Sequence, residues 1–266
     1  MGGRGGNSHF EAVSRIFQSA RSFLTQAYGA LHARAVLSIL SKAPAYIQAM
    51  WQAYAEDFRA IAVAAFSDDA YYSPGDDSVH LNIARVARGD RISTPYSTLF
   101  HEYGHMTDYL IARQYGLGRY SAYSQYYQGL DSDGEPIFGY AGGGLLGRTA
   151  KDEVSKHISR MMQKYPGITK QQAATALANE IKQKYSELDR SDVSDMLEGG
   201  GLGIAYPLGA GHGLGYWHSR DSSLEIFAEM TSAEASHPGS LKAIKEYFPD
   251  TYKVYRDMTK GLKKKK

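Results

Sequence analysis

The amino-acid sequence of 266 residues contains no cysteine, so the chain can form no disulfide and offers no thiolate to a metal or a substrate. Any metal ion must therefore be held by histidine, aspartate or glutamate. Long apolar runs are missing as well, since the longest uninterrupted one covers residues 60–66, and a transmembrane helix needs about 20 residues. The glycine-rich residues 1–9 lack the apolar segment of a secretion signal, and we expect no membrane span and no lipid signal.

The net charge is also small, so there is no strong electrostatic reason to expect nucleic-acid binding. The formal charge is +2, from 30 basic and 28 acidic residues. Four of the lysines are residues 263–266, and without them 26 basic residues face 28 acidic ones, a balance of −2. We interpret this lysine run as a solvated tail and expect no nucleic-acid partner.

The periodicity of the apolar residues predicts an α+β fold that is mostly helical. Helical spacing covers residues 10–40 and 46–65, and helices with threonine caps are expected to begin at Thr149 and Thr169. Apolar residues alternate over Val79–Ile83 after a turn-like stretch, as they do on a half-buried strand. We therefore expect a hairpin or edge strand at that point in an otherwise helical chain.

The strongest motif lies on a helix that Thr94, as the N-cap, and Pro95, as the first helical residue, are predicted to begin. This helix contains the HExxH pattern formed by His101, Glu102 and His105. Because helical residues four apart share a face, the two imidazoles can bind one zinc ion. Glu102 then faces a zinc-bound water and can take its proton. The alternative is that both histidines are ordinary core or surface residues of an amphipathic helix.

A catalytic zinc ion normally has three protein ligands and one open position. The third histidine of a metzincin is excluded, because Asp108 and Ile111 stand where that extended motif needs glycine and histidine. Glu225 and Glu229 lie one turn apart on a later predicted helix, so one can bind zinc while the other accepts a hydrogen bond from a ligand histidine. Glu225 also fits a capping box with Ser222, which would make it a helix cap and not a ligand.

A glycine-rich segment precedes that helix. Eight of the seventeen residues 199–215 are glycine, which predicts a loop or irregular strand whose backbone approaches another group closely. His212 and His218 are either alternative zinc ligands or solvated loop residues. Asp108 could orient a ligand histidine, or it could be an exposed helix residue.

Two sets of residues resemble known metallopeptidases. His-Glu-Tyr-Gly-His-Met-Thr-Asp at residues 101–108, followed far downstream by Glu-Ile-Phe-Ala-Glu at residues 225–229, resembles the catalytic domain of anthrax lethal factor and related gluzincin metallopeptidases. The segments at residues 72–82, 211–217 and 247–249 resemble more closely the metallopeptidase-like modules attached to phage minor head proteins and to bacterial polymorphic toxins.

The resemblance covers about residues 71–108 and 211–258. It implies a zincin-like fold with a small sheet packed on the HExxH helix, and Zn²⁺ as the cofactor. It also implies that an edge strand, expected at Val79–Ile83, aligns an extended peptide by strand addition. An ordinary hairpin strand under the helix would explain the same pattern without a substrate.

The resemblance also assigns roles to single residues. It implies that Glu225 is the third zinc ligand beside the two histidines, and that Glu229 supports the site from behind. A tyrosine near these helices usually stabilises the oxyanion in such enzymes. The nearest matches here are Tyr216, which we favour, and His218; Tyr216 could equally be a packing residue.

We therefore expect a zinc-dependent endopeptidase that acts on a peptide or protein substrate and is of the phage-associated or toxin-effector kind. The alternative is a non-catalytic phage head morphogenesis or structural module that retains the scaffold. For either function we expect partners in a virion or a delivery system. The expected location is then the virion, or the cytoplasm before delivery. The expected organisation is a flexible tail (1–8), one domain (9–260) and a lysine tail (261–266). Within the domain we expect, in chain order, helices (9–66), the strand and HExxH helix (71–116), an insertion (117–198), a glycine-rich loop (199–221) and the Glu-bearing and C-terminal helices (222–260).

Overall fold

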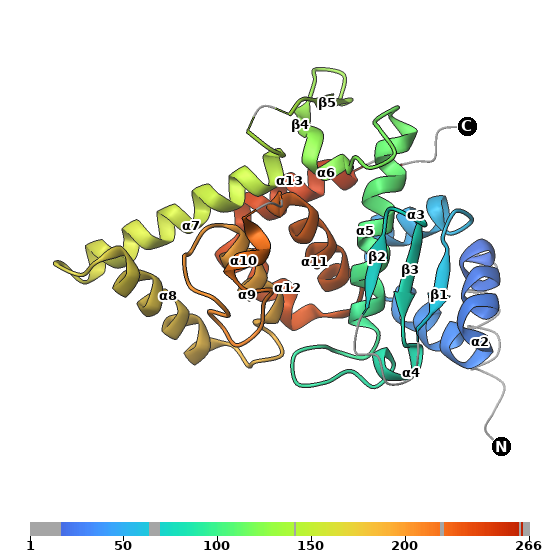
Figure 1. The fold of residues 1–266 in the computed structure, drawn as a ribbon, viewed down its shortest axis with the longest axis horizontal. Helices are drawn as coiled ribbons and strands as arrows, with labels where there is room; N and C mark the ends of the chain where they lie inside the picture. The colour runs from blue at the N-terminus through green and yellow to red at the C-terminus, as the bar shows by residue number, and fades with distance from the viewer. Residues whose placement is uncertain (1–16, 64–69, 141, 219–220, 261, 263–266) are drawn as a thin grey trace.

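The structure is a computed structural model that describes residues 17–63, 70–140, 142–218, 221–260 and 262. Within these ranges the chain is mostly helical and has two small sheets, which confirms the predicted α+β class (Figure 1). No helix among the described residues is long and apolar enough to cross a membrane. The predicted tail at 1–8, and all of the predicted lysine tail except residue 262, lie outside the described residues.

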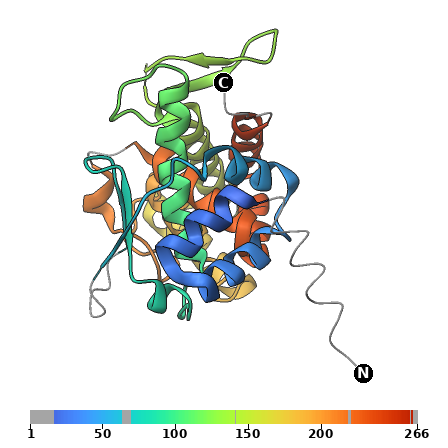
Figure 2. The ribbon, with the colours of Figure 1, turned by 90° about the vertical axis from the view of Figure 1, so that its right-hand side faces the viewer.

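The N-terminal half forms a three-stranded sheet beside two helices. Helix α2 (Gln18–Leu40) is followed by α3 (Ala45–Tyr54), and Figure 2 shows both to one side of the strands. Strand β1 (Ala60–Ala62) pairs in parallel with β3 (Ser78–Leu81), and β2 (Tyr71–Ser73) pairs antiparallel with the other edge of β3. The order β1-β3-β2 leaves β1 and β2 at the edges.

The strand predicted at Val79–Ile83 is present and forms a hairpin with β2, which confirms the first alternative, but the alternative of an edge strand is wrong. All four residues of β3 are buried, and both of its edges are covered by neighbouring strands. The strand also ends earlier, because Ile83 begins the short helix α4 (Ile83–Val86). The reason for the error is β1, a three-residue strand inside the stretch for which apolar spacing predicts helix. Such a short strand leaves no period-2 pattern to detect.

Helix α5 (Ser97–Gln114) carries the HExxH residues and packs against α11 (Ser222–Ser236). At Gly104 a Cβ atom would lie only 3.0 Å from Cα of Ala228, so a larger residue would push the two backbones apart. Strands β2 and β3 also contact α5. The sheet and α11 therefore fix the position of the HExxH helix.

The start of α5 differs from the prediction. Tyr96 has a left-handed conformation with φ of 66°, and its N–H donates to the Val86 carbonyl at 2.9 Å. The turn is thereby tied to α4, and the helix begins at Ser97. The prediction that Thr94 caps this helix is wrong, because its hydroxyl makes no hydrogen bond to any described residue.

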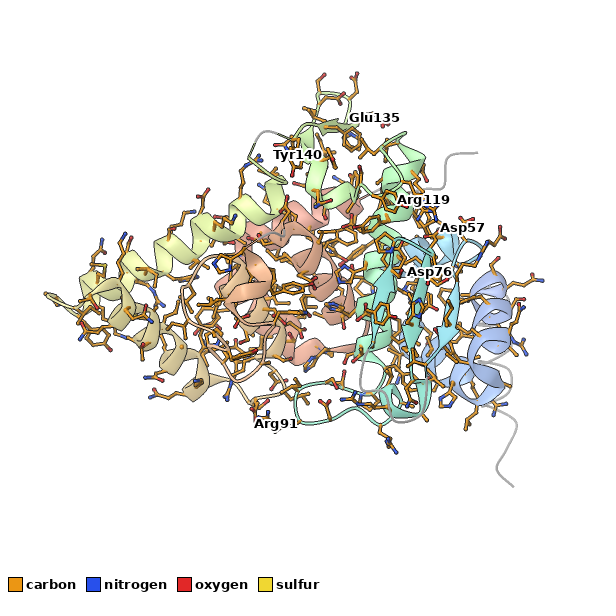
Figure 3. All side chains as sticks on the ribbon, viewed as in Figure 1. Asp57, Asp76, Arg91, Arg119, Glu135 and Tyr140 are labelled. Carbon is orange, nitrogen blue, oxygen red and sulfur yellow. The ribbon has the colours of Figure 1, made fainter. Side chains whose placement is uncertain are left out.

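The turn between β2 and β3 is fastened to the C-terminal end of α5. Arg113 donates to both carboxylate oxygens of Asp77, at 2.6 and 2.5 Å, and the Tyr72 hydroxyl donates to the same carboxylate at 2.8 Å. Arg119, labelled in Figure 3, donates to the Gly75 carbonyl at 2.9 Å. These contacts hold β2 in a fixed position beside the HExxH helix.

The C-terminal half is helical apart from one two-stranded sheet. The predicted insertion at 117–198 contains that sheet and the projecting helix pair α7–α8 (Figure 1). Thr169 caps α8 as predicted, since its hydroxyl accepts the Gln172 N–H at 3.2 Å. The predicted cap at Thr149 is wrong, because α7 already begins at Leu145. The elements not yet described are α6 (Tyr123–Tyr126), β4 (Tyr127–Leu130), β5 (Pro136–Phe138), α7 (Leu145–Lys164), α8 (Lys170–Lys184), α9 (Ser191–Gly199), α10 (Leu214–Trp217), α12 (Pro238–Tyr247) and α13 (Pro249–Thr259).

Candidate metal centre

Two histidines and a glutamate from facing helices bring three ligand atoms together. Nε2 of His101 and Nε2 of His105 lie 3.1 Å apart on α5. Oε2 of Glu225, on α11, lies 3.4 Å from the first nitrogen and 3.3 Å from the second. Ligands 2.0–2.1 Å from a tetrahedral zinc ion are about 3.3 Å from one another. The triangle formed by these three atoms therefore has the size of one face of a zinc site.

The chemistry of these atoms also fits a cation. Glu225 is buried, and its Oε2 makes no hydrogen bond with any described residue, although it faces both rings. A buried acceptor without a partner is costly unless another positive group compensates it. Burial raises the pKa of Glu225, but the charges of His105 and His101 outweigh that effect and hold it well below its usual value. The site thus favours a carboxylate that faces positive charge.

Glu102 is the other carboxylate close to the two histidines. His101, Glu102 and His105 offer ligand atoms within 4.8 Å of one another and form a group that can hold a metal ion. One oxygen of Glu102, Oε2, already accepts the backbone N–H of Tyr72 at 2.9 Å. This bond ties Glu102 to the edge strand β2, whereas Oε2 of Glu225 faces both ring nitrogens. Each carboxylate thus has one oxygen that accepts a hydrogen bond, and Oε2 of Glu225 lies within 3.4 Å of both ring nitrogens.

A cavity of about 390 Å³ opens in front of these residues. Its walls come from β2, α5, the glycine-rich segment and the start of α11, and they include Tyr72, Tyr109, His212, Tyr216 and Leu224. The candidate ligands are thus accessible to a small molecule or a peptide segment, while most of their surface is covered.

The two glutamates of α11 lie on the face that meets α5. Oε2 of Glu229 lies 3.5 Å from Nδ1 of His101, the ring nitrogen that does not face Glu225. Glu229 is therefore placed to orient that ring. Burial raises the pKa of Glu229 to about 8, even though the nearby His101 acts in the opposite direction.

The alternative in which Glu225 is a helix cap is not what the structure shows. The N-cap of α11 is Asp221, whose Oδ1 accepts the Ser223 N–H at 2.9 Å. Ser222 is the first helical residue, and its hydroxyl has no hydrogen-bond partner among the described residues. Glu225 therefore lies one position beyond the capping box and is free to face α5.

The prediction that Asp108 orients a ligand histidine is wrong. Asp108 is fully buried, and its two oxygens accept the backbone N–H of Ser124 at 2.8 Å and the hydroxyl of the same residue at 2.5 Å. No hydrogen bond joins it to His101 or His105 among the described residues. Burial raises the pKa of Asp108 to about 7, although these hydrogen bonds lower it. Asp108 connects α6 to α5 and does not support the metal site.

Of the two predicted oxyanion stabilisers, the structure brings only Tyr216 to the site. The Tyr216 hydroxyl donates to Oε1 of Glu225, the oxygen that does not face the histidines. His218 is exposed at the end of α10 and is not one of the described residues that line the cavity. The prediction of His218 as a catalytic residue or zinc ligand therefore has no geometric support.

His212 also lies in the cavity wall, and its contacts join it to Tyr216 and Asp195. Its ring stacks on Tyr216 with centroids 4.2 Å apart and an angle of 22° between the planes. Its Nδ1 lies 2.8 Å from Oδ1 of Asp195 on α9. Burial disfavours a charged ring, yet the hydrogen bond and charge of Asp195 raise the pKa of His212 to about 9. The contact with Asp195 thus holds the His212 ring beside the candidate ligands.

Sequence reasoning missed two carboxylates of α9, Asp195 and Glu198, which hold the glycine-rich segment. Both are buried and accept hydrogen bonds from residues of that segment. Their spacing of three residues on a predicted helix indicated a shared face, but nothing in the sequence indicated what that face contacts. The chain matches no protein family, no curated protein and no solved structure. The candidate site is therefore interpreted from its own geometry.

Proposed function

We propose that this protein is a zinc-dependent endopeptidase with a zincin-like site. The observation that supports this most strongly is the triangle of His101 Nε2, His105 Nε2 and Glu225 Oε2, with sides of 3.1, 3.4 and 3.3 Å. Two imidazoles and one carboxylate are a known donor set of catalytic zinc. Glu102 lies beside them on the cavity wall. A purely structural zinc site would need neither the cavity nor this carboxylate.

The residues around the triangle can divide the work of peptide hydrolysis. Bound zinc supplies Lewis acidity that activates a water molecule and a carbonyl group. Glu102 accepts the proton of the attacking water, and the Tyr72 N–H holds its carboxylate in place. His212, and Tyr216 once its hydroxyl turns away from Oε1 of Glu225, donate hydrogen bonds to the carbonyl oxygen as negative charge develops there.

The substrate strand binds along β2 in this proposal, and not along Val79–Ile83. The Tyr72 N–H donates to Glu102, so the edge of β2 away from β3 borders the cavity, and a peptide would pair with the other main-chain groups of that edge. An extended peptide can add to such an edge through main-chain hydrogen bonds. The metallopeptidase-like modules of phage minor head proteins and polymorphic toxins are the class to which we assign the chain in this proposal.

The test combines zinc content with peptide cleavage by the wild type and by Glu102→Gln. We expect about one zinc ion per chain in both proteins, because the substitution removes a base and not a ligand. Cleavage of a diverse peptide library should be seen only with the wild type. Zinc content below about 0.2 per chain that added zinc does not restore would refute the metal site. Full cleavage by Glu102→Gln would refute the mechanism, and zinc binding without any cleavage by the wild type would favour the structural module.

A further inference from the structure

The glycine-rich segment, taken as the whole loop 199–221 that carries His212 and Tyr216, is anchored on one buried side chain. Glu198 on α9 is 2% exposed, and its carboxylate collects four N–H groups of this segment. The donors to its two oxygens are the backbone N–H of Tyr206, the backbone N–H of His212 at 3.1 Å, the backbone N–H of Gly213 at 3.0 Å and the indole Nε1–H of Trp217 at 3.0 Å.

One glycine of the segment, Gly211, is explained by this close approach. At Gly211, where φ is +135°, a Cβ atom would lie 2.8 Å from the carboxylate of Glu198. Any side chain at this position would collide with the anchor, and the backbone conformation itself favours glycine. The expectation that backbone in this segment approaches another group closely is thus confirmed, and the group is Glu198.

We propose that Glu198 is a positioning residue for the hydrolytic site, an inference that rests on the proposed function for its kinetic part. Among the described residues, no hydrogen bond or ion pair joins Glu198 to the candidate zinc ligands or to Glu102. It fixes the backbone that carries His212 and Tyr216, which line the same cavity as Glu102. Loss of the anchor lets that wall move, so hydrolysis falls although the zinc ligands stay in place.

The test compares Glu198→Ala with Glu198→Gln. The amide can keep an oxygen for the three donors at Oε2, but it places an NH₂ group against the Tyr206 N–H. A displacement of about 1 Å in an active site can cost about 100-fold in rate, so we expect a loss of that order in kcat for Glu198→Ala. Glu198→Gln should recover part of it. Zinc binding should survive in both variants because the three candidate ligands are unchanged, and its affinity should fall by no more than the about 10-fold to 100-fold of a lost supporting group, here the Tyr216 hydroxyl on Glu225. We therefore compare kcat at saturating zinc.

The indole of Trp217 reports on the anchor without any substrate. The chain has two tryptophans, and Trp217→Phe identifies the emission of this one. Emission of Trp217 should shift to longer wavelength in Glu198→Ala and return toward the wild-type value in Glu198→Gln. The matched control is Glu153→Ala, which removes a carboxylate that is equally buried and accepts the N–H groups of Asp250 and Thr251. It should destabilise the fold but change neither Trp217 emission nor kcat.

Each outcome decides the proposal. Unchanged Trp217 emission in folded Glu198→Ala would show that Glu198 is not the anchor. Shifted emission with unchanged kcat, or the same loss of kcat in Glu153→Ala, would overturn its positioning role. A zinc-loaded wild type that cleaves no peptide would refute the proposed function and this role with it, while the emission would still decide whether Glu198 anchors the segment.

Discussion

Glu225→Gln tests directly whether the carboxylate that faces the two histidines is a metal ligand. Glu225 is buried, and its Oε2 lies 3.4 Å from His101 and 3.3 Å from His105. The amide has the same size but no negative charge. Removing one partner of a buried charge pair costs about 3–5 kcal/mol. Since 1.4 kcal/mol is a tenfold change, we expect zinc affinity to fall by about 100-fold to about 4,000-fold.

The assay is a competition titration of zinc against a chromophoric chelator, with thermal unfolding of each metal-free variant as a check on folding. Glu229→Gln is the informative neighbour, because Glu229 lies 3.5 Å from the other nitrogen of His101. Loss of such a supporting group typically lowers metal affinity about 10-fold to 100-fold. Glu153→Gln changes a buried carboxylate that binds the start of α13 and none of the candidate ligands, and it should leave zinc affinity unchanged.

Wild-type zinc affinity in folded Glu225→Gln would refute the assignment. If zinc binding survived this change but was lost in Glu229→Gln, the ligand would lie one turn further along α11. If both variants kept zinc, the third ligand would have to be Glu102, the other carboxylate in the group that can hold a metal ion.

Three further predictions concern the surroundings of the site. Gly104→Ala should destabilise the fold by about 1–3 kcal/mol through overpacking, as measured by denaturant unfolding. It should also weaken zinc binding because α5 and α11 move apart, as measured by chelator titration. Tyr216→Phe should lower kcat at saturating zinc by about 100-fold to 1,000-fold, as for a lost oxyanion donor. It should also weaken zinc binding by about 10-fold to 100-fold, because its hydroxyl supports Glu225, whereas His218→Ala should change neither. Ser124→Ala should raise the pKa of Asp108 above its value of about 7 in an NMR pH titration, since the hydroxyl lowers it. The pKa of Asp108 in the folded protein exceeds its ordinary value of 3.8, so the folded state binds the proton more tightly than the unfolded state does. The contribution of Asp108 to the free energy of unfolding should therefore grow as pH falls from about 7 toward 4. A contribution that shrinks over this range would contradict the burial of Asp108.

The residues of the candidate site that the sequence could predict are those defined by spacing within one helix. His101 and His105 share a face because they are four residues apart, and Glu225 and Glu229 do so for the same reason. What spacing could not show is that the two faces meet. That depends on the contact of α5 with α11 at Gly104, where no side chain separates the helices.

The features that the sequence could not predict depend on pairings between distant segments. Strand β1 has only three residues and is defined by its pairing with the parallel strand β3. The apolar spacing around it therefore predicts a helix. Asp108 lies on the same stripe as the histidines, yet Ser124 takes both of its oxygens. Nothing in the sequence distinguishes Glu198 from the other glutamates, because its role depends on the contact with the glycine-rich segment in the folded chain.

The start of α11 shows how a shift of one residue decides between a structural and a chemical role. Ser222 and Glu225 fit a capping box only if Ser222 is the N-cap, because the box joins the N-cap to the third helical residue. Asp221 takes the N-cap position, which makes Glu225 the fourth helical residue. From there its carboxylate faces His101 and His105 instead of turning back to the helix start. The local pattern allowed both roles, and the competing cap one residue earlier leaves Glu225 available as a ligand.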